Sequence, residues 1–192
     1  MALSTIGTNA VADDAVTATK IADAVALGKV GQVVTDSFTG TESSTSNAAG
    51  DSFTDSSVTA TITPTATSSK IFVSCQINAG AGSYSDGSHI GRFTQAISGG
   101  STTVVNVGAT SGNRIEVSSG RGSESQGSNT LLNTHFSFVL SPSTTSAVTV
   151  TYQFARRGNG SATAYINRTG DDGDNIEQQR AASQITLMEV LA

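Results

Sequence analysis

From residue 28 onward the chain alternates apolar and polar residues, which is the pattern of β-strands that bury one face. In the clearest runs Val, Ile, Phe or Leu alternates mainly with Thr, Ser or Gln, and these runs are residues 58–63, 71–77, 136–140 and 148–154. Pro64 and Pro142 lie in the Ser/Thr-rich loops after the first and third runs, where a proline removes no hydrogen bond from a strand ladder. The sequence therefore predicts two β-hairpins.

Six weaker runs show the same tendency, and they are residues 29–35, 90–97, 102–107, 113–117, 162–166 and 184–190. Together with the four clear runs they make about ten short strands at regular spacing. We expect an all-β fold, an antiparallel β-sandwich of jelly-roll type. The Gly/Ser/Asn-rich stretches 79–88 and 118–129 are too polar for strands and predict long surface loops, which often carry binding.

Two of the predicted strands carry apolar residues on both faces. Phe72 lies out of phase with the other apolar residues of its strand, and Met188 and Val190 lie out of phase with Ile185 and Leu187. A single sandwich buries one face of each strand and leaves the other face in water. We therefore expect a homotrimer with Phe72, Met188 and Val190 at its interface and with the C-terminal strand near the threefold axis.

Residues 1–28 differ from the rest of the chain. The tripeptides Asn-Ala-Val at 9–11, Asp-Ala-Val at 14–16 and Asp-Ala-Val at 23–25 form a short imperfect repeat that cannot bury an apolar face alone. The pattern fits either an amphipathic helix or an extended arm that becomes ordered against other chains. We predict an attachment arm at 1–28 and a head domain at 29–192, and the apolar residues expected to attach the arm to its partner protein are Val11, Val16, Ile21 and Val25.

Composition and charge narrow the possible functions. Hydrophobic residues make up 36% of the 192 residues and charged residues only 13%, and the net charge is −5. Without a Lys/Arg stripe we expect no nucleic-acid partner. The sequence has no signal-peptide pattern and no apolar run of membrane-spanning length, so we expect neither secretion by the general route nor membrane insertion. Cys75 is the single cysteine, which excludes an intrachain disulfide.

Residues suited to catalysis are few, and we expect no enzyme activity and no cofactor. Cys75 alternates in phase with buried positions and predicts a small buried hydrophobe. His135 lies in a predicted strand and is interpreted as a packing or interface residue, while His89 follows a Gly/Ser loop and is interpreted mainly as a solvated loop residue.

One acidic segment is a weak candidate for calcium. Its carboxylates surround a glycine as in oxygen-rich calcium loops, but their spacing is not that of an EF-hand. Asp, Asn and Gly are also the usual turn residues, so we expect a structural loop without metal. The candidate ligands are Asp171, Asp172 and Asp174.

Several segments resemble the tail-fibre-like proteins of tailed bacteriophages, especially marine and cyanobacterial phages. They are ADDAVTATKIAD at 12–23, GKVGQVV at 28–34, VTATITP at 58–64, SSKI at 68–71, SPSTTS at 141–146, YINRTG at 165–170 and ITLMEV at 185–190. The segments span most of the chain in the same order as in that family. The resemblance implies a trimeric virion protein, made in the host cytoplasm, with a β-sandwich head and a thin N-terminal attachment.

The expected function is that of a tail fibre or similar appendage, in which the arm docks on a tail or baseplate protein and the head presents loops to a host-surface glycan. Trimer valency would multiply weak contacts. The loop residues that offer suitable groups are Tyr84, Asp86, His89, Asn113, Arg114 and Arg121. The alternative is a capsid decoration (cement) or head-fibre protein that stabilises the shell. A glycan-cleaving tip is disfavoured because it needs two opposed carboxylates, and acids are sparse outside 171–177.

Overall fold

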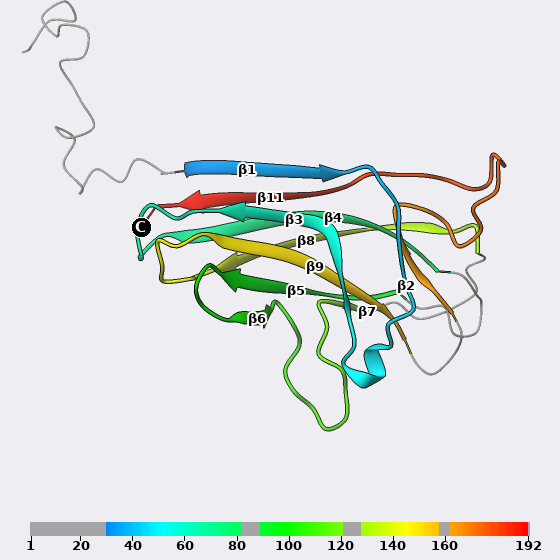
Figure 1. Ribbon diagram of the computed structural model, residues 1–192, viewed down its shortest axis with the longest axis horizontal. Helices are drawn as coiled ribbons and strands as arrows, with labels where there is room; N and C mark the ends of the chain where they lie inside the picture. Colours follow the sequence, from blue (N-terminus) through cyan, green and yellow to red (C-terminus); the bar gives the residue numbers. More distant parts are fainter. Residues whose placement is uncertain (1–29, 82–88, 121–127, 158–161, 192) are drawn as a thin grey trace, which may run out of the picture.

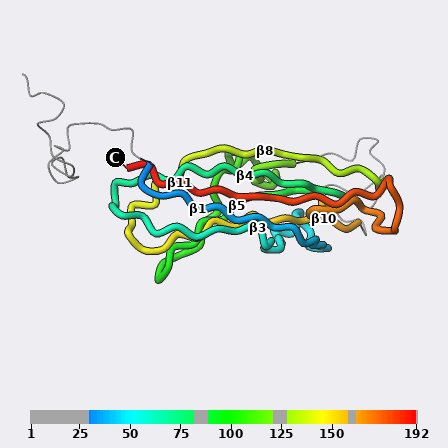
Figure 2. The backbone as a smooth tube through the Cα atoms, turned by 90° about the horizontal axis from the view of Figure 1, so that it is seen from above, coloured from blue at the N-terminus to red at the C-terminus, as the bar shows by residue number. Residues whose placement is uncertain are grey.

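Two antiparallel sheets packed face to face account for nearly all of the regular structure in the computed structural model (Figures 1 and 2). The structure describes residues 30–81, 89–120, 128–157 and 162–191. The prediction of a nearly all-β, sandwich-like fold is confirmed for this part of the chain.

The six-stranded sheet is organised around its longest strand, β4 (Lys70–Ala81). One edge of β4 pairs first with β11 (Ser183–Val190) and then with β10 (Ala164–Ile166), and the opposite edge pairs with β8 (Leu131–Leu140). The outer strands of this sheet are β1 (Val30–Phe38) beside β11 and β2 (Glu42–Ser44) beside β10 on one side of β4, and β8 on its other side.

The second sheet has five strands, ordered β3-β9-β5-β6, with the short β7 beside the start of β5. Its strands are β3 (Thr54–Ile62), β5 (His89–Ile97), β6 (Thr102–Val105), β7 (Ser119–Gly120) and β9 (Val148–Arg156). A short 3-10 helix, η2 (Ala48–Gly50), precedes β3.

The prediction of two β-hairpins is wrong. β3 and β4 belong to different sheets, as do β8 and β9, and the pairs that do form ladders are β3 with β9 and β4 with β8. All four strands have one apolar face. Because the chain crosses from one sheet to the other after β3 and after β8, each strand can turn its apolar face towards the shared core. The connections 63–69 and 141–147 are long enough to span the ~10 Å between packed sheets.

Other strand predictions hold to different degrees. The segments at 29–35, 90–97, 102–107, 162–166 and 184–190 all contain strands. The predicted strand at 113–117 is absent, because Gly112 adopts a positive φ of 58° and the chain turns there, while Ile115 and Val117 pack as loop residues. The predicted loop at 79–88 is wrong at its start, since β4 continues through Ala81 to pair with β10.

The core lies between the sheets and is centred on Phe93 of β5, which is fully buried. The Phe93 ring meets Phe136 of β8 edge-on at 5.1 Å between centroids and meets Tyr152 of β9 at 5.2 Å. Aromatic contacts of this geometry add to the stabilisation from buried area. Cys75 of β4 is 1% exposed, which confirms the prediction of a buried residue, and its burial raises the pKa of the thiol to about 12.

Glu189 is the charged residue on the inner face of β11. It is fully buried, and its carboxylate accepts hydrogen bonds from the Gln32 side chain at 2.8 Å and from the Thr65 backbone N–H at 2.6 Å. A bulge in β1 makes this possible, because Val30 pairs with Val190 and Val33 with Met188, so that two residues, Gly31 and Gln32, oppose Glu189.

Gly31 leaves the space that this carboxylate occupies. A Cβ at Gly31 would lie 2.9 Å from Glu189 Oε2 and 3.0 Å from Leu191 Cδ2. The carboxylate thereby ties β1, β11 and the β3–β4 connection together at one end of the sandwich. Burial by itself would raise the pKa of Glu189, but the hydrogen bonds from Gln32 and Thr65 outweigh it and lower the pKa to about 2.

Glu189→Gln is expected to lower the free energy of unfolding at neutral pH by about 1–3 kcal/mol, because the charged acceptor of several buried hydrogen bonds is lost. Since folding lowers the pKa of Glu189 from 4.5 to about 2, its contribution is complete above pH 4.5 and disappears as the pH falls towards 2. Urea unfolding at several pH values would show a steep acid loss in the parent protein and a shallower one in the variant. Glu177→Gln, at an exposed position, is the control; equal acid profiles for Glu189→Gln and the parent would contradict the assignment.

Candidate functional site

The outer face of the six-stranded sheet carries an apolar stripe at one end. A row of directly paired residues crosses β1, β11, β4 and β8, and direct partners in antiparallel strands point to the same face. A second row beside it is apolar in β1 and β11, where Val30 pairs with Val190, and ends at the exposed Lys70 of β4. We call this set the outer stripe, and its members are Val30, Val33, Phe72, Val139, Met188 and Val190.

The outer stripe is exposed to solvent in the single chain. Val33 and Val139, at its two ends, are 53% and 56% exposed. Of the seven large hydrophobic side chains that are exposed among the described residues, four belong to the stripe. Such concentrations of exposed apolar surface usually mark interaction sites.

The stripe has a defined boundary along the sheet. The next row towards the other end is wholly polar and consists of Thr35, Thr186, Ser74 and Ser137, with the first two hydroxyls 3.0 Å apart. The apolar patch is therefore confined to the end where β1 begins and β11 ends (Figure 1). The sequence pointed to Phe72, Met188 and Val190, which the structure brings together; Val33 and Val139 were missed, although both lie out of phase with the inward residues of their strands.

A groove on the opposite, outer face of the five-stranded sheet contains two of the predicted receptor-binding residues. Asn113 and Arg114 lie in the loop that faces η2 across the groove, and the cavity has a volume of about 440 Å³. Arg92 of β5 and Glu116 also line it. The groove thus combines both charges with amide and backbone groups, which suits a hydroxylated or charged surface ligand.

Arg92 is the fixed element of this groove. Its guanidinium donates to Asp51 Oδ1 at 2.6 Å and to Gln153 Oε1 at 2.9 Å, and it lies 3.9 Å from the centroid of the Phe53 ring. Arg114, in contrast, is exposed, and within the described part of the chain its guanidinium makes one long contact, 3.4 Å to Ser111 Oγ. The sequence gives no local signal for Arg92 and Asp51, because their ion pair joins segments about forty residues apart.

The other predicted receptor residues do not gather in this groove. His89 begins β5 and is 3% exposed, so its interpretation as a solvated loop residue is wrong; its Nε2 lies 3.0 Å from the Tyr152 hydroxyl. Tyr84, Asp86 and Arg121 lie outside the described residues, as do the attachment residues Val11, Val16, Ile21 and Val25. His135 is exposed on the outer face of β8 opposite Gln76.

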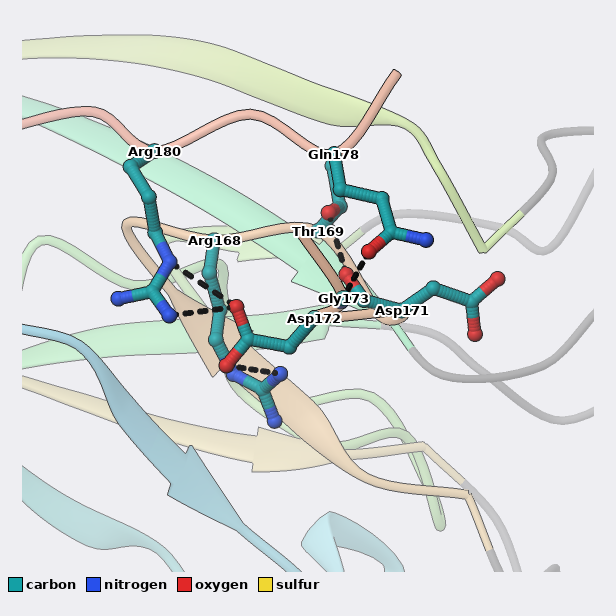
Figure 3. Close-up of polar contacts among 7 residues, drawn as sticks. All are labelled: Arg168, Thr169, Asp171, Asp172, Gly173, Gln178 and Arg180. Atoms are coloured by element: carbon teal, nitrogen blue, oxygen red, sulfur yellow. Dashed lines mark hydrogen bonds and ion pairs between the residues drawn. The ribbon is translucent and has the colours of Figure 1, made fainter. Parts of the chain in front are cut away.

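The acidic loop holds its carboxylates by protein contacts (Figure 3). Asp172 accepts hydrogen bonds from Arg180 at 2.6 and 2.9 Å, and its other oxygen lies 3.1 Å from Arg168 Nη1. Asp171 accepts a hydrogen bond from Ser128, and its carboxylate points away from that of Asp172. The arginines occupy the position that a cation would need at Asp172.

Within the described ranges, no three His, Cys, Asp or Glu side chains are grouped so as to hold a metal ion, and no helix there has the length and hydropathy to cross a membrane. Comparison of the chain with protein-family models finds no match, and comparison with curated proteins finds no significant match. The resemblance to phage tail-fibre-like proteins therefore stays an expectation based on the sequence segments.

Calcium is expected to leave the melting temperature of the protein unchanged and to produce no binding heat, because Asp172 already has two arginine partners.

Asp172→Asn is expected to lower the free energy of unfolding by about 1 kcal/mol through the loss of these charge-assisted contacts. Thermal unfolding and calorimetric titration with calcium would measure both effects.

Asp174→Asn, in the same loop, is the matched control and should change stability by less than about 0.5 kcal/mol. A melting temperature that rises steeply with calcium would contradict the structural role of the loop.

Proposed function

We propose that the chain is a non-enzymatic structural protein of a tailed-phage virion, a homotrimeric fibre-like appendage. In this proposal the arm at 1–28 docks on a tail or baseplate protein, and a head of jelly-roll type faces the host surface. The observation that carries the proposal is the outer stripe, since it gives one face of the head a strongly apolar end that a single chain leaves in water.

The position of the stripe favours a second copy of the same chain as the partner that covers it. It runs across the sheet from one outer strand, β1, to the other, β8, so a neighbouring head that rotates about an axis near β11 meets the same apolar row. Head-to-tail contacts among three copies about such an axis bury the stripe when the rotation between neighbours closes the ring. Burial of the stripe would contribute about 25 cal/mol per Å² of apolar area.

The position of the stripe supports the attachment role. Val30 is both a member of the stripe and the first described residue. If heads associate through the stripe, their β1 strands therefore begin side by side, at the end to which the arm is connected. The groove with Asn113 and Arg114 lies on the outer face of the other sheet. A trimer assembled through the stripe would therefore leave this groove open to a host glycan, and its valency would raise the avidity of weak contacts.

Met188→Asp is expected to convert the trimer to monomers, because it places a charge in the middle of the stripe next to Phe72. Native mass spectrometry and sedimentation of the full chain would report the change, and Val190→Asp should act in the same direction. Thr186→Asp, two residues away on the same face but in the polar row, is the matched control and should stay trimeric. A monomeric parent protein, or a stable Met188→Asp trimer, would contradict the interface.

Deletion of residues 1–26 is expected to leave a soluble, folded head and to abolish incorporation into virions. The reason is that the change in sequence period near Gly28 separates a segment with no core of its own from the strands of the head. Circular dichroism would test the fold, and labelling of purified particles would report both copy number and location. Normal copy number of the truncated chain would show that the arm is not the anchor, and label on the capsid would favour the decoration role instead.

A further inference from the structure

A second cavity opens between the two sheets at the end of the sandwich that is remote from the outer stripe. It has a volume of about 230 Å³ and takes its walls from both sheets. The residues that line it are Ile77, Ala79, His89, Ser119, Gly120, Leu132, Thr134 and Tyr152. Leu132 of β8 is 37% exposed, which places solvent at the rim.

The walls of this cavity differ in chemistry. Strand β4 contributes an apolar surface from Ile77 and Ala79, and the five-stranded sheet contributes a polar one. On the polar side the Tyr152 hydroxyl lies 3.0 Å from His89 Nε2 and 3.5 Å from Ser119 Oγ. These partners offset the cost of burying the hydroxyl, which Tyr152 places on the cavity wall.

The fold makes room for this hydroxyl. Gly91 pairs with Phe154 across the β5–β9 ladder and lies diagonal to Tyr152, and a Cβ on it would come within 1.7 Å of the Tyr152 oxygen. The His89 ring is stacked nearly parallel to Tyr152 and to Phe154, at interplanar angles of 5° and 11°. The polar groups are thus held in fixed positions by packing, as a pre-formed binding site requires.

We propose that this cavity binds one ring of a neutral sugar, with the apolar ring face against Ile77 and Ala79 and the hydroxyls on Tyr152, Ser119 and Thr134. Among the described residues that line the cavity none is Asp, Glu, Lys or Arg, and this part of its wall matches a ligand without formal charge. The volume of about 230 Å³ lies below the roughly 300–1,000 Å³ of pockets for drug-sized ligands, which limits the occupant to a single ring. Each protein hydroxyl both donates and accepts, as does each sugar hydroxyl.

This inference deepens the host-attachment part of the proposed function and rests on it for its biological meaning. A terminal neutral sugar of a host-surface glycan would enter the cavity, while the groove with Arg92 and Arg114 would meet adjoining groups of the surface. The site itself is built by residues of one chain, so it does not depend on the trimer.

Titration of the purified full chain with glucose, galactose and N-acetylglucosamine tests the proposal, with saturation-transfer NMR and calorimetry as readouts. At least one of these neutral sugars should bind with a Kd on the order of 1 mM, and N-acetylneuraminic acid, which is charged, should bind at least tenfold more weakly. Tyr152→Phe removes only the hydroxyl and should weaken binding about tenfold. Thr134→Val, at the rim, should weaken it in the same direction.

Tyr165→Phe is the matched control, because Tyr165 lies in β10 under the Arg168 guanidinium and does not line the cavity. Binding of none of the three neutral sugars, or unchanged binding by Tyr152→Phe, would overturn the proposal. The mass of the assembly, measured on the same samples, distinguishes failure of the sugar site from failure of the proposed function. A trimer that binds no sugar overturns only the sugar site, whereas a monomer overturns the proposed trimeric appendage.

Discussion

The structure depends on the burial of one apolar face of each sheet against the other. Phe93 occupies the centre of this contact and touches aromatic rings from both sheets, Phe136 on one side and Tyr152 on the other. Without a disulfide, this packing and the strand ladders hold the described part of the chain together. The burial requirement also explains why consecutive strands such as β3 and β4 cross between the sheets: each must turn its apolar face to the same core.

Polar groups appear inside the sandwich where the packing of the sheets ends. At one end Glu189 is held by Gln32 and Thr65 and ties β1 to β11 and to the β3–β4 connection. At the other end Tyr152, His89 and Ser119 form the polar wall of a cavity. The first group is enclosed by its hydrogen-bond partners, whereas the second lies on the wall of the cavity to which we assign a sugar ligand.

The two outer faces of the sandwich differ, and this difference organises the proposed function. The outer face of the six-stranded sheet carries the outer stripe at the end where β1 begins. The outer face of the five-stranded sheet is partly covered by η2 and by the loop with Ile115 and Val117, which leave a polar groove beside Arg92. One face thus suits permanent contact between copies, and the other suits reversible contact with a hydrated surface.

The sequence by itself determined the class of fold and the position of most strands, because the alternation of apolar and polar residues is local and follows the two-residue period of a strand. It also determined that Phe72, Met188 and Val190 lie out of phase with the core, and that Cys75 lies in phase with it. Only the tertiary structure decided which strands pair, that Val33 and Val139 complete the stripe, and that His89 is buried beside Tyr152. These facts depend on contacts between residues far apart in the chain, and such contacts are selected by the fit of whole sheets to a common core, which leaves no signature in any short segment.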